Sequence, residues 1–366
     1  MNDTPPPTVD LLIAGLGPGG CAAALAARQA GLRTVAVEAR AVEATRAQLV
    51  LVRPGAQAAL RSIGLPDVTG GRRTSSIRHV ENRMRAAVLE ATGDPWLSVQ
   101  WQSSVCGLHL LDGQVCVTLR DNRDGKQRQI MAKRLIDATG GRLEDVGRPA
   151  RHRRGPRHWV IAAEYGTPPW FEGIVGVRDP KTHEMYLLFP TWGRHGVICY
   201  HDAPPGDAVS AEALQQRFAL AAQRLGLGAP LQKVVAIDVQ QRLLPQACND
   251  LVLPIGDAVG TVDVLLGAGM SIAIEDGVDA ARAVANALQQ RQPAALTAVS
   301  RHLYRRHRAA HWRGRCLLGV RPLIERAWPS ADLLTLGREQ LAPPPLLWPA
   351  VRLLFGRRPA ALSERR

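Results

Sequence analysis

The glycines of the segment GLGPGG are the first residues in the chain that could do chemistry. Gly15, Gly17 and Gly20 have the spacing G-x-G-x-x-G, and Pro18 and Gly19 complete the loop. The first glycine of such a loop permits a tight turn, the second lets a pyrophosphate approach the backbone, and the third lets a helix pack closely on a strand. The N–H groups that begin this helix stabilise phosphate charge. The segment therefore predicts a site for the phosphates of a dinucleotide.

An acidic residue stands where such a site needs one. Glu38 lies 23 positions after Gly15, near the end of the apolar run RTVAVEAR. The run VDLLIAG before the loop and the stretch GCAAALAARQAG after it predict a strand and a helix, so a βαβ unit is expected. A carboxylate at the end of the second strand binds ribose hydroxyls and disfavours a 2′-phosphate. These elements predict NAD or FAD, rather than NADP.

A second glycine motif decides between these two cofactors. It lies in LVLPIGDAVGTVDVLLGAGMSIAIEDGVDAARAV, which resembles the second FAD fingerprint of flavoprotein monooxygenases of the aromatic-hydroxylase type, including p-hydroxybenzoate hydroxylase-like and ubiquinone-pathway hydroxylase-like enzymes. The resemblance implies that the aspartate of a Gly-Asp pair bonds the ribityl chain of FAD. It also implies that a helix after the later glycines points its N-terminus at the flavin ring. The matching residues are Gly256, Asp257, Gly267, Ala268, Gly269 and Met270.

Weaker matches extend this resemblance over residues 9–290. RLIDATGG is similar to the family's strand beside the adenosine, and RHVENRMRAAVLEA to the entry of a family helix. The resemblance places Arg46 near the flavin and Val105 near the adenine. Two alternatives stay open, that Asp257 only caps a helix and that Arg46 is a surface arginine. We expect IEDGVDAARA to be an amphipathic helix without chemistry in its acidic residues.

The resemblance implies an FAD-dependent monooxygenase acting on an aromatic or polyketide-like small molecule. The reduced flavin would react with O₂ to a C4a-hydroperoxide, and NADH or NADPH would supply electrons directly or through a flavin reductase. Gly260 and Val264 depart from the family pattern, which has histidine and proline there. The alternatives are a two-component styrene-type epoxidase, a flavin-dependent reductase or halogenase, and a non-catalytic FAD-binding partner. No catalytic side chain and no metal-ligand cluster can be assigned from spacing.

Aromatic residues in EMYLLFPTWGRHGVICYH are the candidates for a substrate pocket. This segment lies in a strand-rich block that the family places over the flavin ring. Such a block could supply an apolar pocket. The alternative is that its residues belong to an ordinary core and its turns. The candidates are Tyr186, Phe189, Trp192 and His195.

The elements that must position these residues indicate an α/β protein. We expect a Rossmann-like FAD-binding domain of the GR2 type, an inserted mainly β substrate domain and a helical C-terminal tail. A helix is expected over ENRMRAAVLEATG after a mixed stretch, and another after Ser210 as its N-cap. The expected parts are the FAD-binding domain in three segments (1–72, 101–158 and 246–295), a helical connection (73–100), the substrate sheet (159–245) and the basic helical region (296–366).

Composition limits the partners and the compartment. The net charge is +14 and only four of the 46 basic residues are lysines, but no nucleic-acid recognition motif accompanies them, so nucleic acid is not expected. The basic tail predicts a helical pair packed on the FAD-binding domain with its arginines outward, or alternatively a membrane-surface anchor. Six cysteines without C-x-x-C spacing indicate mostly core thiols in a reducing compartment. With no secretory segment visible, we expect a cytoplasmic protein, with contact at the inner membrane face left open.

Overall fold

The structure is a computed structural model. The residues that it describes are 8–43, 49–66, 68, 74–141, 143, 157–166, 175–178, 185–191, 194–202, 210–224, 226–231, 234–240, 242–244, 250–261, 269–290, 292 and 294–327.

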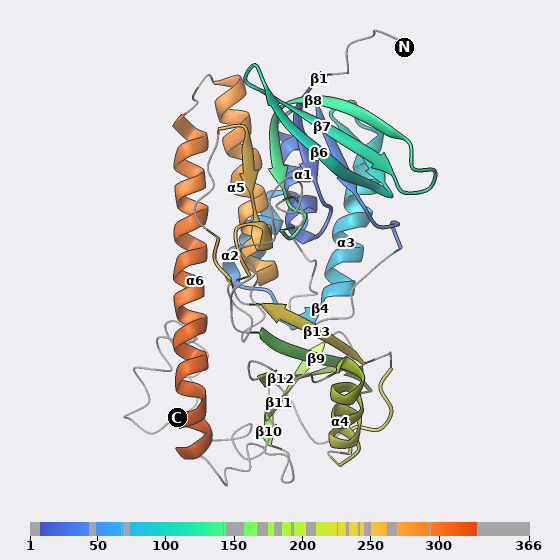
Figure 1. Ribbon diagram of the computed structural model, residues 1–366, viewed down its shortest axis with the longest axis vertical. Coiled ribbons are helices and arrows are strands. Elements are labelled where there is room, and N and C mark those ends of the chain that lie inside the picture. The colour runs from blue at the N-terminus through green and yellow to red at the C-terminus, as the bar shows by residue number, and fades with distance from the viewer. Residues whose placement is uncertain are drawn as a thin grey trace.

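A seven-stranded sheet forms the upper part of the molecule in Figure 1. Its path is β5-β2-β1-β8-β7-β6, and β14 pairs with β8 beside this path. The pairs among β5, β2, β1, β8 and β14 are parallel, whereas β6 and β7 form an antiparallel meander that leads into β8. The strands are β1 (Thr8–Ala14), β2 (Thr34–Glu38), β5 (Leu97–Trp101), β6 (Ser103–Leu111), β7 (Gln114–Asp121), β8 (Gln127–Asp137) and β14 (Val252–Pro254).

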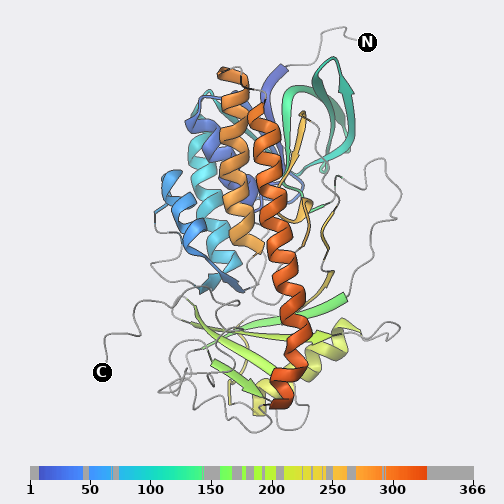
Figure 2. The same ribbon diagram turned by 90° about the vertical axis from the view of Figure 1, so that its left-hand side faces the viewer.

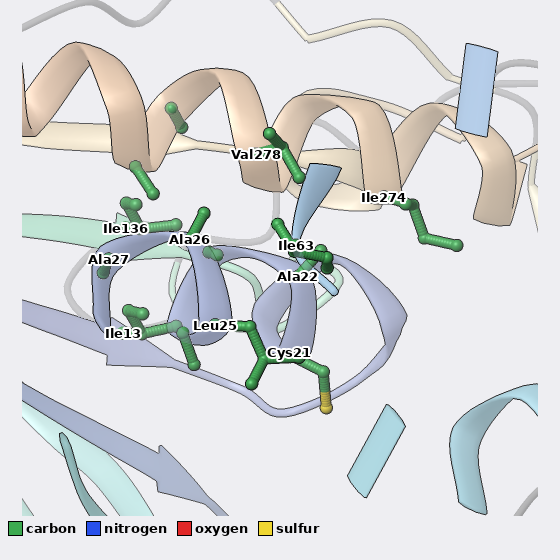
Figure 3. Close-up of a cluster of buried hydrophobic side chains, with 14 of the residues drawn as sticks. Ile13, Cys21, Ala22, Leu25, Ala26, Ala27, Ile63, Ile136, Ile274 and Val278 are labelled. Atoms are coloured by element: carbon green, nitrogen blue, oxygen red, sulfur yellow. The ribbon is translucent and has the colours of Figure 1, made fainter. Parts of the chain in front are cut away.

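Strand β1 is buried on both faces because layers cover the sheet on each side. Leu11 and Ile13 belong to a core with the helices α1 (Pro18–Gln29) and α5 (Gly269–Gln289), whereas Leu12 packs on the side of the meander. Figure 3 shows α1 between β1 and α5, with short side chains along the contact. This arrangement confirms the expected α/β class and the βαβ unit.

Two short helical segments flank this core, α2 (Pro54–Ser62) and α3 (Ile77–Glu90), which is followed by a 3₁₀ turn at Ala91–Gly93. A two-stranded sheet of β3 (Leu49–Leu51) and β4 (Thr74–Ser76) precedes α3. The prediction that the helix begins near Glu81 is wrong, because α3 begins at Ile77. Ile77, Val80 and Met84 are spaced three and four residues apart and are all buried, so packing extends the helix into the stretch that looked mixed.

A second sheet of five antiparallel strands lies in the lower part of Figure 1, in the order β10-β11-β12-β9-β13. Helix α4 (Ala211–Arg224) covers one of its faces and completes a separate core. The Ala213 N–H donates to the Ser210 hydroxyl at 3.1 Å, so the predicted N-cap of this helix is confirmed. The strands are β9 (Arg157–Tyr165), β10 (Val175–Arg178), β11 (Met185–Thr191), β12 (Arg194–Asp202) and β13 (Val235–Gln240).

The basic tail forms one long helix, α6 (Ala294–Ala327), within the described residues. It lies beside α5 and extends past it to the level of the second sheet (Figures 1 and 2). Packing of α6 on α5 agrees with the prediction that the tail packs on the FAD-binding domain, and the rest of the basic region, where the second helix of the expected pair would fall, lies outside the described residues. The prediction of outward arginines is wrong for Arg306, which forms ion pairs with Asp276 and Asp279 of α5.

Among the described residues, no helix has the length and apolar character needed to cross a membrane. The same part of the chain contains no cluster of His, Cys, Asp and Glu that could hold a metal ion. Its cysteines are free: Cys21, Cys116 and Cys199 are buried as expected of core thiols, whereas Cys106 and Cys316 are exposed; Cys248 lies outside the described residues.

Candidate functional site

The loop between β1 and α1 has the geometry of a phosphate-binding turn. Gly15 has a φ of +97°, and a Cβ there would lie 2.6 Å from the Ala138 carbonyl oxygen. Only glycine fits such a backbone against a neighbouring strand end. A Cβ on Gly17, by contrast, would meet nothing within 4 Å, although Gly17 is the N-cap of α1. The space in front of Gly17 and the free N–H groups of the first helical turn suit an anion.

Gly19 and Gly20 bring backbones together behind this loop. A Cβ on Gly20 would collide with the Gly15 carbonyl, and a Cβ on Gly19 would lie 2.8 Å from the carbonyl oxygen of Ala273 in α5. Pro18 occupies the first turn of α1, where its missing N–H costs nothing. The loop glycines therefore divide into one that faces open space and others that let β1, α1 and α5 approach closely.

Glu38 lies at the end of β2 and next to this loop, as the βαβ pattern predicts. The residue is 5% exposed, and its carboxylate accepts the Leu16 N–H at 2.8 Å and the Arg40 Nε–H at 2.9 Å. Burial raises the pKa of the Glu38 carboxyl, but the hydrogen bonds and charge of Arg40 and the Leu16 N–H outweigh burial, so the pKa lies below its ordinary value. Glu38 is thus held as a carboxylate beside the helix N-terminus.

The sequence reasoning did not identify a group of charged residues next to Glu38, of which Glu81 and Arg85 are buried and Arg40 is partly buried. Arg40 lies 4.0 Å from the carboxylate of Glu81 in α3. Arg85, one turn later in α3, donates to the Val42 carbonyl at 3.0 Å and lies 5.6 Å from the ring centroid of Trp101. Glu81 and Arg85 lie among Val80, Met84 and Val88 on the buried face of the helix. Charged residues at such apolar positions were the sequence signal that could have identified this group.

The third strand end beside the loop belongs to β8. Asp137 accepts both the N–H and the hydroxyl of Thr139, at 3.0 and 2.7 Å, which shapes the turn of the predicted segment RLIDATGG. A Cβ on Gly140 would lie 4.0 Å from the Cβ of Asp257. The turn after β8 therefore contacts the Gly-Asp motif, so the structure brings the early loop, Glu38 and the late motif to one edge of the sheet.

The Gly-Asp motif forms a 3₁₀ turn, Gly256–Ala258, directly after β14. Gly256 has a φ of +57° and lies against Ala273 of α5. Asp257 is exposed, and its Oδ1 would lie 3.8 Å from a Cβ on Gly269, the first residue of α5. The carboxylate thus stands beside the N-terminus of a long helix, where the resemblance places the ribityl chain and the flavin ring.

Of the remaining predicted residues, Met270 follows Gly269 at the start of α5, whereas Val105 and Tyr186 lie in β6 and β11. Val105 packs in part against the meander core, and Met270 is buried in the main core. Tyr186 is 1% exposed, and its ring lies 5.7 Å from that of Phe218 in α4, which is the position of a core residue. The predicted residues that lie outside the described residues are Arg46, Trp192, Val264, Gly267 and Ala268, together with the side chains of Phe189 and His195.

These residues fit the AMP and ribityl portions of FAD. The open space at Gly17 suits a pyrophosphate, and the buried carboxylate of Glu38 suits a ribose. The exposed carboxylate of Asp257 lies next to the start of α5, whose first N–H groups have no acceptor within the helix itself. The fold and the site thus define a dinucleotide-binding protein of the two-motif flavoprotein class.

Comparison with protein families gives the same answer independently. Residues 78–312 match the family described as the FAD binding domain, and this match covers more than half of the chain. The protein belongs to this family, and FAD is its cofactor. No curated protein sequence matches the chain.

Solved structures share the fold at low sequence identity. PqsL of Pseudomonas aeruginosa, described as a probable FAD-dependent monooxygenase, has a TM-score of 0.66 and 19% identity, over 86% of this chain and 96% of PqsL. The flavin-dependent monooxygenase PieE, solved with FAD and substrate, has a TM-score of 0.64 and 19% identity, over 84% of this chain and 64% of PieE. A geranylgeranyl bacteriochlorophyll reductase-like protein of Thermoplasma acidophilum has a TM-score of 0.65 and 18% identity, over 90% of this chain and 90% of that protein. The chain thus has a fold used by flavin-dependent monooxygenases and reductases.

Proposed function

We propose that this protein is an FAD-dependent monooxygenase that hydroxylates an aromatic or polyketide-like small molecule. The observation that carries the proposal is the meeting of three groups at one sheet edge: the α1 N-terminus with open space at Gly17, the carboxylate of Glu38, and Asp257 at the start of α5. Family membership and the fold shared with PqsL and PieE support the activity.

Each of these groups has a binding task. The α1 N-terminus at Gly17 would hold the pyrophosphate, Glu38 the adenosine ribose, and Asp257 the ribityl chain. The start of α5 at Gly269 would stabilise negative charge on the ring of the reduced cofactor through its N–H groups and dipole. Bound FAD supplies the activation of O₂ and the transfer of one oxygen atom. The chain's part is to bind and orient the cofactor and to exclude water from the reacting atoms.

A pair of glycine variants tests the cofactor site. In Gly17→Ala the new methyl group meets no protein atom, so the apo-protein should unfold at the wild-type temperature while its affinity for FAD falls at least tenfold. In Gly20→Ala the methyl group collides with the Gly15 carbonyl, so the unfolding temperature should fall. Fluorescence titration with FAD and thermal unfolding measure the two effects. Wild-type FAD affinity in Gly17→Ala would contradict the assigned pyrophosphate site.

The reaction is tested with labelled oxygen. The protein is incubated with NADH or NADPH, a panel of phenols and polyketide-like aromatics, and ¹⁸O₂, with and without an added flavin reductase. Mass spectrometry should find one ¹⁸O atom in a product. A requirement for the reductase would assign a two-component enzyme. A reduced product without ¹⁸O would contradict the monooxygenase activity and indicate a flavin-dependent reductase instead. That alternative is favoured by the Thermoplasma acidophilum neighbour.

We further propose that the outer face of α6 contacts an anionic lipid bilayer. Arg301, Arg305, Arg308, Trp312 and Arg315 are exposed and recur at intervals of three and four residues, which places them on one side of the helix. Trp312 is 59% exposed, although an indole side chain is usually covered or lies at a membrane interface. This combination of guanidinium groups and an exposed indole is typical of helices that lie on anionic membranes.

The lack of neutralising partners supports this proposal. The first three arginines of the face form no ion pair in the described part of the chain, and α6 contains no acidic residue before Glu325. Replacing Arg301, Arg305 and Arg308 by glutamate should abolish co-sedimentation with phosphatidylglycerol vesicles.

A control variant with the same change of charge keeps this test specific. Glutamate at Arg61, Arg83 and Arg120, which are exposed on other elements, should leave most of the vesicle binding intact. Equal losses in both variants, or equal binding of wild type to phosphatidylcholine vesicles, would overturn the membrane proposal.

A further inference from the structure

A buried cluster of charges between α5 and α6 has no part in the function proposed so far. Asp276 of α5 is 0% exposed. Its Oδ1 accepts from Arg306 Nη1 at 2.7 Å, and its Oδ2 lies 2.6 Å from His307 Nε2. The same Oδ2 accepts the N–H of Gly256 at 3.1 Å. One buried carboxylate thus joins α6 to the first residue of the Gly-Asp motif.

His307 makes a second contact with the same turn. The residue is 1% exposed, and its Nδ1 lies 3.3 Å from the carbonyl oxygen of Gly260. Gly260 stands where the resembled family has a histidine. The two nitrogens of one imidazole therefore reach Gly260 directly and Gly256 through Asp276. These two residues are the ends of the turn that presents Asp257.

The charges in the cluster explain why it tolerates burial. Arg306 also donates to Asp279 at 2.7 Å and lies 3.7 Å from the carboxylate of Glu275. Burial raises the pKa of Glu275, with Arg306 opposing this effect. A buried carboxylate is costly unless it is paired and hydrogen-bonded, and Asp276 has both kinds of partner. The pairing therefore fixes how α6 is seated on α5.

The turn itself has little freedom to shift away from this contact. A Cβ on Gly256 would lie 2.9 Å from the Ala273 Cβ, and a Cβ on Gly260 would lie 2.5 Å from the Arg242 carbonyl oxygen. Leu244 and Arg242 donate backbone N–H groups to Val259 and Thr261. With α5 on one side and the 242–244 segment on another, the contacts of His307 and Asp276 add to those that hold the turn carrying Asp257.

We propose that His307 and Asp276 are positioning residues for FAD, acting through the Gly256–Gly260 turn. The inference rests on the proposed role of Asp257 in holding the ribityl chain. His307 hydrogen-bonds the far end of the turn and orients Asp276, which holds its near end. Removing the imidazole breaks the contact with Gly260 and takes away one of the partners that orient Asp276, so Asp257 is held less firmly beside the α5 N-terminus and FAD binds more weakly.

The test compares three variants by titrating FAD into apo-protein. His307→Phe fills a similar volume without hydrogen bonds and should weaken FAD affinity at least tenfold and shift the visible absorption of the bound flavin. His307→Gln reaches one partner and should give an intermediate affinity. Leu303→Ala, which opens a cavity in the α6 contact with the main core, should lower the unfolding temperature by a similar or larger amount and keep the wild-type FAD affinity and spectrum.

The outcomes separate the inference from the function on which it rests. Failure of wild type to bind FAD would overturn the proposed function itself. Wild-type binding together with unchanged affinity in His307→Phe would overturn only the positioning role. An equal loss of affinity in Leu303→Ala would also overturn it, because a general loosening of α6 would then suffice. If His307→Phe does not fold, His307→Gln decides, and wild-type affinity and spectrum in that variant would overturn the role.

Discussion

Glu38 illustrates how a single residue serves fold and site together. Its carboxylate receives hydrogen bonds from the backbone of the phosphate loop at Leu16 and from Arg40. These donors fix the carboxylate where a ribose would bind, and they also tie the end of β2 to the start of α1. A residue expected from the βαβ pattern to bind ligand is thus also part of the protein's own hydrogen-bond network.

Glu38→Gln should destabilise the apo-protein at neutral pH by about 1.5–3 kcal/mol, the usual contribution of hydrogen bonds to a charged group. The folded pKa of Glu38 lies below its ordinary value of 4.5, so this stability is present above pH 4.5 and is lost as the pH falls through the folded pKa. Denaturant unfolding from pH 7 to pH 3 should therefore show the difference between wild type and variant shrinking below pH 4.5. A difference that stays constant over this range would contradict the assigned charge.

At the scale of elements, the contact of α1 with α5 determines how the two halves of the site meet. In the proposed site the Gly17 end of α1 would bind one part of the cofactor and the Gly269 end of α5 another, so the separation of these two parts depends on this helix crossing. Small residues line it, and a Cβ on Gly277 would collide with the Gly19 carbonyl. Because the helices touch through backbone atoms, side-chain rearrangement cannot absorb added volume.

Gly277→Val should therefore lower the free energy of unfolding by about 1–3 kcal/mol or more and weaken FAD binding as well, because the helices must move apart. Arg282→Val places the same side chain on an exposed position of α5 and is the control. Chemical denaturation and FAD titration measure both properties. Wild-type stability in Gly277→Val would mean that the two helices are not in close contact.

At the scale of the whole molecule, the described residues form several hydrophobic cores, and two of them lie in different parts of the molecule. One surrounds α1 and α5, and the other joins the second sheet to α4 through Phe218, Tyr186 and their neighbours. We propose that the second sheet is the substrate domain, in line with the division of the chain expected from its sequence. Because Tyr186 faces α4, substrate contacts must come from other residues of this sheet.

Phe218→Ala should destabilise the second core by about 3–5 kcal/mol through the cavity it leaves. FAD affinity should stay close to that of wild type, because the residues proposed to hold the cofactor lie on the elements of the other core. Leu220→Ala, on the exposed side of the same helix, is the control and should change neither property. A loss of FAD affinity in Phe218→Ala as large as that in Gly17→Ala would show that the cores are not independent.

The sequence by itself determined the local part of the site and the class of the fold. The spacing of Gly15, Gly17 and Gly20, and the place of Glu38 at a strand end, follow from a single βαβ unit, in which neighbours in sequence are neighbours in space. The Gly256–Asp257 pair before a helix was visible for the same reason. Helix boundaries such as the start of α3 were less predictable, because burial rather than local pattern extends them.

Only the tertiary structure decided what lies around this site. Asp276 appeared to be an ordinary helical residue, yet it is joined to Gly256, 20 residues earlier, and to His307, 31 residues later. For Tyr186 the sequence left open a pocket or an ordinary core, and the structure shows that it packs on α4. Which face of an element is covered depends on its partners in the fold, and hydrogen bonds between distant segments depend on how whole helices are seated. Neither property is encoded in the spacing of nearby residues.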